Sequence, residues 1–366
     1  MRHNIWRISI MKKTAKLGLG MAAVGMAFTL TACGSDKKED DKKSDHSAAI
    51  VTDVGGVDDR SFNQSAWEGL QKWGKSHDLK KGVGGYDYLQ SQTAADYTTN
   101  LDKAVQAGYK TIFGVGYLLK DSVEKAAKQN PNTNFVIIDD VIKGQKNVAS
   151  AVFKDNEAAY LAGVAAAYTT TTNKVGFIGG EEGAVIDRFQ AGFEQGVKDG
   201  AKQLHKNIKV DVKYAASFGA PDKGKALAAQ MYKNGADVIY HAAGGTGAGV
   251  FQEAKALNEK GNGKKVWVIG VDSDQQAEGE YTNKDGKKDN CTLTSTIKGV
   301  NVAVEKICQD AWDNKFPGGK VLSYGLKDNG VSITKGFLST KAWKAVEQAK
   351  KSVIDGKVEV ASTPKK

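Results

Sequence analysis

Three acidic side chains stand at or just beyond the ends of apolar runs that are typical of buried strands. They are Asp53, Asp139 and Asp272. In open α/β sheets, ligands bind beyond the carboxyl ends of the strands. A single aspartate at such a place is commonly a helix cap, but three at separate strand ends favour a cleft rich in hydrogen-bond acceptors. Such a cleft suits a neutral polyol or an amine-bearing ligand.

An aromatic ring and an amide lie together at one expected helix start, as Phe62 and Asn63. Either they contact a ligand, or Phe62 is a hydrophobic staple and Asn63 a capping residue. The residue types alone leave both interpretations open.

Catalysis has weaker support from the sequence than ligand binding. Asp139 and Asp140 could act as a carboxylate pair for glycosidic cleavage, but adjacent residues on a strand point to opposite faces. His241 lies at a strand end, where a structural role is expected. The loop Gly244–Gly249 lacks the Lys-Ser/Thr ending of a phosphate-binding loop, and no Gly-x-Ser-x-Gly elbow occurs. We expect a binding protein, not an enzyme.

The elements that would position these residues alternate between strands and helices. Such alternation predicts parallel sheets built of βαβ units, an α/β fold. About 320 residues follow the N-terminal region, which suits two domains. The expected strands are 48–54, 111–115, 135–139, 148–153, 175–178, 238–242 and 266–271, and the expected helices 62–75, 94–107, 121–129, 158–168, 186–198, 224–233 and 250–259.

The N-terminus is typical of an export signal. Residues 1–32 carry five basic and no acidic side chains and include an apolar stretch at 17–30, too short to span a bilayer. Met11 opens the usual Met-Lys-Lys pattern and is an alternative start. The tetrad Leu-Thr-Ala-Cys predicts acylation of Cys33, and the charged, apolar-free segment after it, through residue 47, is expected to be a flexible tether.

Charge and cysteine content exclude other classes. The net charge of +10 falls to +5 without the five basic residues of the signal, and no basic cluster alternates with aromatics. Nucleic-acid binding therefore has little support. Cys291 and Cys308 are expected to be buried thiols, a disulfide being the alternative, and no spacing indicates a metal or cofactor site.

Several motifs resemble the basic membrane lipoprotein family, whose members include purine nucleoside receptor lipoproteins. The block from Asp53 to Gln64, with Ser-Phe-Asn-Gln at its end, and His-Ala-Ala-Gly-Gly-Thr-Gly at 241–247 are the most specific. The resemblance runs from about residue 48 to 355, and its other runs are 135–139, 160–163, 175–180 and 268–272.

The resemblance implies a type I periplasmic-binding-protein fold, with two Rossmann-like lobes and a hinge of about three crossings. We place the crossings near residues 153, 272–290 and 325. The first lobe is then 48–153 plus about 291–325, and the second 154–290 plus about 326–360.

The resemblance also implies the site. Phe62 and Phe218 would sandwich a base, and Asp139 would read it. The sugar would meet the polar side chains of Asp53, Asn63, Asp272 and Lys298, with Gly245 allowing close backbone approach.

The expected function is that of a lipid-anchored, monomeric binding protein on the outer face of the cell membrane. It would bind a purine-type nucleoside and deliver it to the permease and ATPase subunits of an ABC importer. The alternatives are a sugar-binding lipoprotein of the same fold, a sensing or adhering lipoprotein, and a nucleoside-cleaving enzyme.

Overall fold

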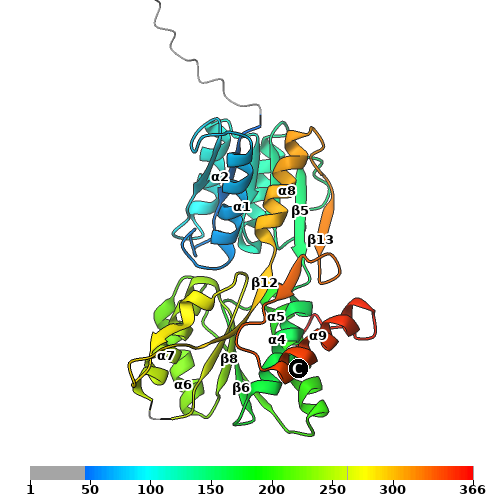
Figure 1. The fold of residues 1–366 in the computed structure, drawn as a ribbon. Coiled ribbons are helices and arrows are strands. Elements are labelled where there is room, and N and C mark those ends of the chain that lie inside the picture. The colour runs from blue at the N-terminus through cyan, green and yellow to red at the C-terminus, as the bar shows by residue number, and fades with distance from the viewer. Residues whose placement is uncertain (1–45, 262, 366) are drawn as a thin grey trace, which may run out of the picture. The chain divides into compact units, whose positions relative to one another are not determined.

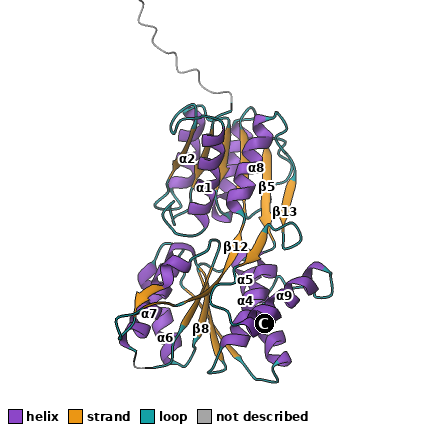
Figure 2. Ribbon diagram, viewed as in Figure 1, coloured by secondary structure: helices purple, strands orange, loops and turns teal. Residues whose placement is uncertain are grey.

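The computed structural model describes residues 46–261 and 263–365 (Figure 1). Within them, two six-stranded, mostly parallel sheets are covered by helices, as the α/β prediction requires (Figure 2). The signal segment, Cys33 and the tether up to residue 45 lie outside the described residues. No helix in the described ranges combines the length and apolarity needed to cross a bilayer.

The first sheet has the strand order β13-β5-β4-β3-β1-β2, and all its strand pairs are parallel. Its strands are β1 Ala48–Val51, β2 Tyr86–Leu89, β3 Thr111–Gly114, β4 Asn134–Ile138, β5 Val148–Phe153 and β13 Val321–Tyr324.

The second sheet has the order β14-β12-β9-β8-β6-β7, with β14 antiparallel to β12 at the edge. A separate antiparallel pair, β10 and β11, lies outside it. The strands are β6 Lys174–Gly179, β7 Lys209–Tyr214, β8 Val238–Ala242, β9 Trp267–Gly270, β10 Glu280–Thr282, β11 Lys288–Asn290, β12 Thr292–Lys298 and β14 Val331–Ile333.

Helices cover both faces of each sheet. Helices α1 and α8 lie side by side on the first sheet (Figure 1), whereas α2 contacts β1 and β3, α3 contacts β4, and α2 and α3 contact each other. We call each sheet with its helices one half of the protein. In the second half, which contains the second sheet, α4 and α5 pack together, and α6 packs with α7. The helices are α1 Phe62–Ser76, α2 Asp96–Gln106, α3 Lys120–Gln129, α4 Asp155–Thr169, α5 Ala184–Gln203, α6 Pro221–Lys233, α7 Gly247–Lys260, α8 Val300–Trp312 and α9 Thr340–Ile354.

Strand β1 shows how the sequence produces these layers. Successive side chains of a strand point to opposite faces. Ile50 packs in the same cluster as Leu70 of α1, whereas its neighbour Val51 packs in a second cluster with Leu101 of α2. All four side chains of β1 are therefore buried, which explains why the strand reads as a continuous apolar run.

The chain passes between the two halves three times. It leaves the first sheet after β5, returns after β12, and leaves again after β13. The first and third passages lie near the expected residues 153 and 325. The second does not lie at 272–290, because β12 is hydrogen-bonded to β9 and β14 of the second sheet as far as Lys298. Residues 292–298 thus belong with the second sheet, although the expected first lobe included them.

Candidate functional site

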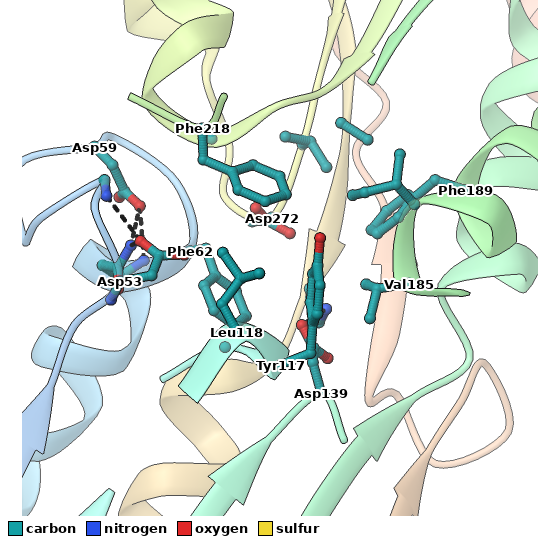
Figure 3. A pocket seen from close by; sticks show the side chains of 18 residues that line it. Asp53, Asp59, Phe62, Tyr117, Leu118, Asp139, Val185, Phe189, Phe218 and Asp272 are labelled. Carbon is teal, nitrogen blue, oxygen red and sulfur yellow. Dashed lines mark hydrogen bonds and ion pairs between the residues drawn. The ribbon is translucent and has the colours of Figure 1, made fainter. Parts of the chain in front are cut away.

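A pocket opens at the carboxyl ends of strands from both sheets (Figure 3). It encloses about 530 Å³ of space free of atoms, part of it open to solvent. The lining residues are Asp53, Gly55, Asp59, Phe62, Asn63, Gly116, Tyr117, Leu118, Asp139, Val185, Ile186, Phe189, Phe218, Ala242, Gly244, Val271, Asp272 and Lys298.

One side of the pocket is a hydrogen-bonded group formed by Asp53, Asp59 and Asn63, here called the amide pole. The Nδ2 atom of Asn63 donates to Oδ1 of Asp53 at 2.7 Å and to Oδ2 of Asp59 at 2.9 Å. The Asn63 carbonyl oxygen accepts the backbone N–H of Asp53 at 3.2 Å. Asn63 is therefore held in one orientation by both carboxylates.

Asp59, which sequence reasoning missed as a site residue, also caps the start of helix α1 with its side chain. Its carboxylate accepts the backbone N–H groups of Ser61, Asn63 and Gln64 at 2.8–3.1 Å. These are the donors that a helix start leaves without intrahelical partners. Asn63 lies inside α1 and does not cap it. Asn63 follows Asp59 by four residues, and this spacing is the signal that could have revealed Asp59 as the capping residue.

The other charged group, here called the lysine pole, consists of Asp139, Asp272 and Lys298. The Nζ atom of Lys298 lies 2.6 Å from Oδ2 of Asp139. The backbone N–H of Lys298 donates to the carbonyl oxygen of Asp272 at 2.9 Å. Oδ1 of Asp139 is buried and has no hydrogen-bond partner within residues 46–261 and 263–365, so one acceptor of this pole remains free there. Buried acceptors in folded proteins are nearly always paired.

Both aspartates of the lysine pole have left-handed backbone conformations. The φ angle is 72° at Asp139 and 66° at Asp272. Aspartate tolerates this region better than most residues do. Asp139 directly follows β4, and Asp272 is the second residue after β9. The two carboxylates are thus placed by strand ends and not by helix caps.

Four aromatic rings from described residues, Phe62, Tyr117, Phe189 and Phe218, line the pocket together with the two poles. Figure 3 shows Phe62 and Phe218 near Tyr117, with Phe189 on the far side from Asp53. Tyr117 and Phe218 are 6.3 Å apart between ring centroids at 81°. The Lys298 ammonium lies 5.0 Å from the ring centre of Phe62 and 5.6 Å from that of Phe189, within cation–π range.

Gly180 makes room for the Phe218 ring. A Cβ atom at Gly180 would lie 2.2 Å from Cε1 of Phe218, closer than any van der Waals contact. Gly180 directly follows β6, so a strand end again decides where a site residue lies.

Burial shifts the pKa values of the charged side chains in the pocket. Burial raises the pKa of Asp53 to about 7, against hydrogen bonds from Gly55 and Asn63 that lower it. Burial likewise raises the pKa of Asp272 to about 7, although Lys298 and Ser61 oppose this. For Lys298, burial lowers the pKa, but Asp139 and Asp155 outweigh it, and the net shift is upward. The Lys298 side chain therefore stays protonated, and the carboxylates of Asp139 and Asp155 both attract it.

The pocket brings together seven of the eight residues expected to bind ligand. They are Asp53, Phe62, Asn63, Asp139, Phe218, Asp272 and Lys298. The eighth, Gly245, is not among the lining residues, whereas its neighbour Gly244 is. Gly244 has a φ of 53°, and this left-handed turn places it at the pocket wall. Cys33 lies outside the described residues.

Sequence reasoning missed the pocket roles of Tyr117 and Phe189. Tyr117 lies in the short 3₁₀ helix that follows β3, and its hydroxyl is buried without a hydrogen-bond partner. Phe189 lies in the second turn of α5. The strand-end rule pointed to the loop of Tyr117 but could not single out its ring. No local signal marks Phe189.

Asp140 and His241, two of the residues weighed for enzymatic roles, do not line the pocket. Asp140 pairs with Lys120 at 2.9 Å and does not line the pocket. His241 is buried, shares a 3.0 Å hydrogen bond with Gln275, and has a pKa lowered by burial to about 4. Cys291 and Cys308 are free, buried thiols. Among the described residues, no cluster of potential metal ligands occurs.

Known proteins are similar to this chain in sequence. The chain is 56% identical over 321 residues to an ABC transporter nucleoside-binding protein, BmpA, of Lactococcus lactis, covering 87% of this chain and 90% of that protein. It is 51% identical to a CD4+ T-cell-stimulating antigen of Listeria innocua, covering 96% and 99%.

A solved structure has the same fold. An ABC transporter system solute-binding protein from Aeropyrum pernix K1 matches with a TM-score of 0.75 and 26% identity, covering 87% of this chain and 94% of that one. The family model described as ABC transporter substrate-binding protein PnrA-like matches residues 46–363. The chain therefore belongs to the Bmp family of ABC transporter substrate-binding proteins.

Proposed function

We propose that this protein binds nucleosides, of the purine type, and delivers them to an ABC importer. The observation that carries the proposal is the placing of the phenylalanine rings of Phe62 and Phe218 between two polar groups in one pocket. A nucleoside matches this pocket, because its flat base could lie between the rings and its hydroxyl-bearing sugar could contact one of the polar groups. The nucleoside-binding relative in Lactococcus supports the same ligand class.

The rings account for the base. Stacking a base on an aromatic side chain contributes about 1–3 kcal/mol and tolerates different bases. Phe62 comes from α1 beside the first sheet, and Phe218 from the loop before α6 in the second half. A base held between them would contact both halves of the protein.

The poles account for the polar edges. Ribose hydroxyls both donate and accept hydrogen bonds. The lysine pole offers a donor in Lys298 and acceptors in Asp139 and Asp272, including the free Oδ1 of Asp139. We assign the ribose to this pole and a base N–H group to the Asp53 carboxyl of the amide pole. The family resemblance implied that Asp139 reads the base and that Asp53 meets the sugar. We exchange these two roles, because Asp139 is ion-paired with Lys298, which the resemblance also places at the sugar.

The wider proposal concerns the protein's place in the cell. The export signal and Cys33 support a lipid anchor on the outer face of the membrane, with residues 34–47 as the tether. We propose that the two sheets form separate lobes, that the protein acts as a monomer without catalytic activity, and that the permease and ATPase subunits are its partners.

A calorimetric screen of residues 47–366 tests the ligand class. Adenosine, guanosine, inosine, uridine, cytidine, the free bases, ribose and other pentoses would each be titrated. Binding of nucleosides without binding of free ribose supports the proposal. Binding of pentoses alone would favour a sugar-binding protein, and release of base from inosine would favour a nucleoside-cleaving enzyme.

A further inference from the structure

A buried carboxylate behind the pocket holds two cations at once. Asp155 is the first residue of α4, and its side chain is fully buried. Its Oδ1 atom lies 3.1 Å from Nζ of Lys298. Its Oδ2 atom accepts Nε and Nη2 of Arg188 at 3.2 and 2.9 Å. Neither Asp155 nor Arg188 is a lining residue of the pocket.

This carboxylate lies where the chain passes between the two halves. Asp155 is the second residue after β5, at the first passage, and Lys298 ends β12, at the second. The third passage is tied to the same turn, because the backbone N–H of Lys154 donates to the Tyr324 carbonyl oxygen at 2.8 Å. The Asp155–Lys298 pair therefore joins two of the three connecting segments directly.

Arg188 links this turn to the pocket wall. It lies on α5, which contributes Val185, Ile186 and Phe189 to the lining. Its guanidinium binds Asp155 at the start of α4, so it joins the starts of two packed helices. Because Arg188 does not line the pocket, we expect a change there to act on the ligand through Asp155 and Lys298.

We propose that Asp155 and Arg188 are a positioning pair that holds the Lys298 ammonium at the ligand and couples it to the hinge. This rests on the proposed function in taking Lys298 as a ligand contact. Lys298 is shared between Asp139, which follows β4 of the first sheet, and Asp155. Arg188 neutralises part of the Asp155 charge and so limits its pull on the ammonium.

The charge count supports this division. Asp139, Asp155, Lys298 and Arg188 carry two negative and two positive charges when ionised, and they form one continuous chain of contacts. Without Arg188, the full Asp155 charge would face Lys298 at low effective dielectric and draw the ammonium away from the pocket. Buried ion pairs are sensitive to the loss of one partner, because the other charge is left uncompensated.

The test is a double-mutant cycle on nucleoside binding. Calorimetry would measure Kd for wild type, Arg188→Gln, Lys298→Met and the double variant, with the tightest ligand of the screen. Arg188→Gln alone should weaken binding about tenfold, the scale of one hydrogen bond to a charged group. In the Lys298→Met background it should change Kd less than about twofold, since residues that act through one another are not additive.

A matched control neutralises a cation elsewhere in the second half. Lys265 pairs with Asp289 at 2.6 Å and does not line the pocket. Lys265→Gln should leave Kd unchanged in both backgrounds. The proposal is overturned by an unchanged Kd for Arg188→Gln, or by equal losses in the two backgrounds, which indicate a merely structural role.

Two further measurements keep the outcome decisive. If the double variant does not fold, Arg188→Lys decides: a cation that still reaches Asp155 should restore most of the affinity lost in Arg188→Gln, and no recovery overturns the proposal. If wild type binds no nucleoside but binds a pentose, the proposed function fails, and the same cycle run with that pentose still tests the positioning pair.

Discussion

The ammonium of Lys298 lies 2.6 Å from the carboxylate of Asp139, although the two residues are 159 positions apart and come from different sheets. Lys298 ends β12 of the second sheet, and Asp139 follows β4 of the first. A rotation of one half against the other would change this distance. The charge balance of the pocket therefore depends on the relative position of the two halves.

Sugar recognition should depend on Asp272. If its carboxylate accepts from ribose hydroxyls, Asp272→Ala removes one or two hydrogen bonds worth about 1.5–3 kcal/mol each. Ribonucleoside binding should weaken at least about tenfold, and binding of the 2′-deoxynucleoside less, because it lacks one donor. Calorimetry with both ligands measures this. Equal losses would show that Asp272 does not hold the ribose.

Base recognition should depend on Phe62 in a way that ignores the sugar. Phe62→Ala removes a stacking surface worth about 1–3 kcal/mol. Ribonucleosides and 2′-deoxynucleosides should therefore lose affinity by the same factor in the same titrations. A loss confined to one of the two sugars would contradict the stacking role.

A single methyl group at Gly180 should disturb the site without touching its polar groups. In Gly180→Ala, the new Cβ would overlap the Phe218 ring and force it to move. All nucleosides should bind more weakly, by up to the stacking contribution of about 1–3 kcal/mol. Gly263→Ala is the control, since a Cβ there meets nothing within 4 Å. Unchanged affinity for Gly180→Ala would mean that the ring position is unimportant.

The contribution of Asp53 and Asp272 to stability should fall as pH rises from about 4 to 7. Asp53 and Asp272 have pKa values of about 7 in the folded protein, against 3.8 as their ordinary value. Between these values the folded state binds more protons than the unfolded state, so the free energy of unfolding decreases with pH. Each such group contributes a slope of about 1.4 kcal/mol per pH unit.

Urea unfolding between pH 4.5 and 7 measures this slope. Asp53→Asn keeps an acceptor for Gly55 and Asn63 but cannot titrate, so its slope should be shallower by about 1.4 kcal/mol per pH unit. Asp121→Asn, at an exposed position on α3, should retain the wild-type slope. Identical slopes for wild type and Asp53→Asn would refute the raised pKa.

The sequence revealed the pocket where strands end in acids and at the start of α1, but it missed the rings of Tyr117 and Phe189, which lie in a short 3₁₀ helix and in α5. Asp139 and Asp272 follow buried central strands whose apolar runs are unmistakable. Tyr117 and Phe189 reach the pocket through tertiary packing, which local patterns do not encode.

The fold shows the same division between central and edge strands. Central strands such as β1 and β4 were expected, whereas the edge strands β2, β7, β13 and β14 were not. An edge strand such as β7 buries little apolar surface and alternates charged and apolar residues. The Thr-rich β12 was missed because its buried polar side chains break the apolar run.

Ligand binding should close the two halves. A nucleoside that contacts both favours the closed state, and the connecting segments would act as the hinge. Small-angle scattering should show a smaller radius of gyration when a binding nucleoside is added. An unchanged scattering profile at saturating ligand would count against closure.

Membrane attachment should depend on Cys33. Cys33→Ser removes the thiol that would carry the acyl chain, so the protein should remain unprocessed or be released from cells. Detergent-phase partitioning of cell fractions measures this. Partitioning of a processed Cys33→Ser protein into the detergent phase would disprove the anchor.

The acidic lining sets a condition on the supply of ligand. Asp53, Asp59, Asp139 and Asp272 face the pocket, and among the described residues Lys298 is the single cation that lines it. A phosphate monoester brings about −1.5 to −2 further charges at neutral pH, which the carboxylates would repel. Nucleotides released from degraded nucleic acid should therefore be rejected until a phosphatase outside the membrane has removed their phosphate. Under the proposed function, uptake of nucleosides from nucleotides would therefore depend on a separate hydrolysis step outside the membrane.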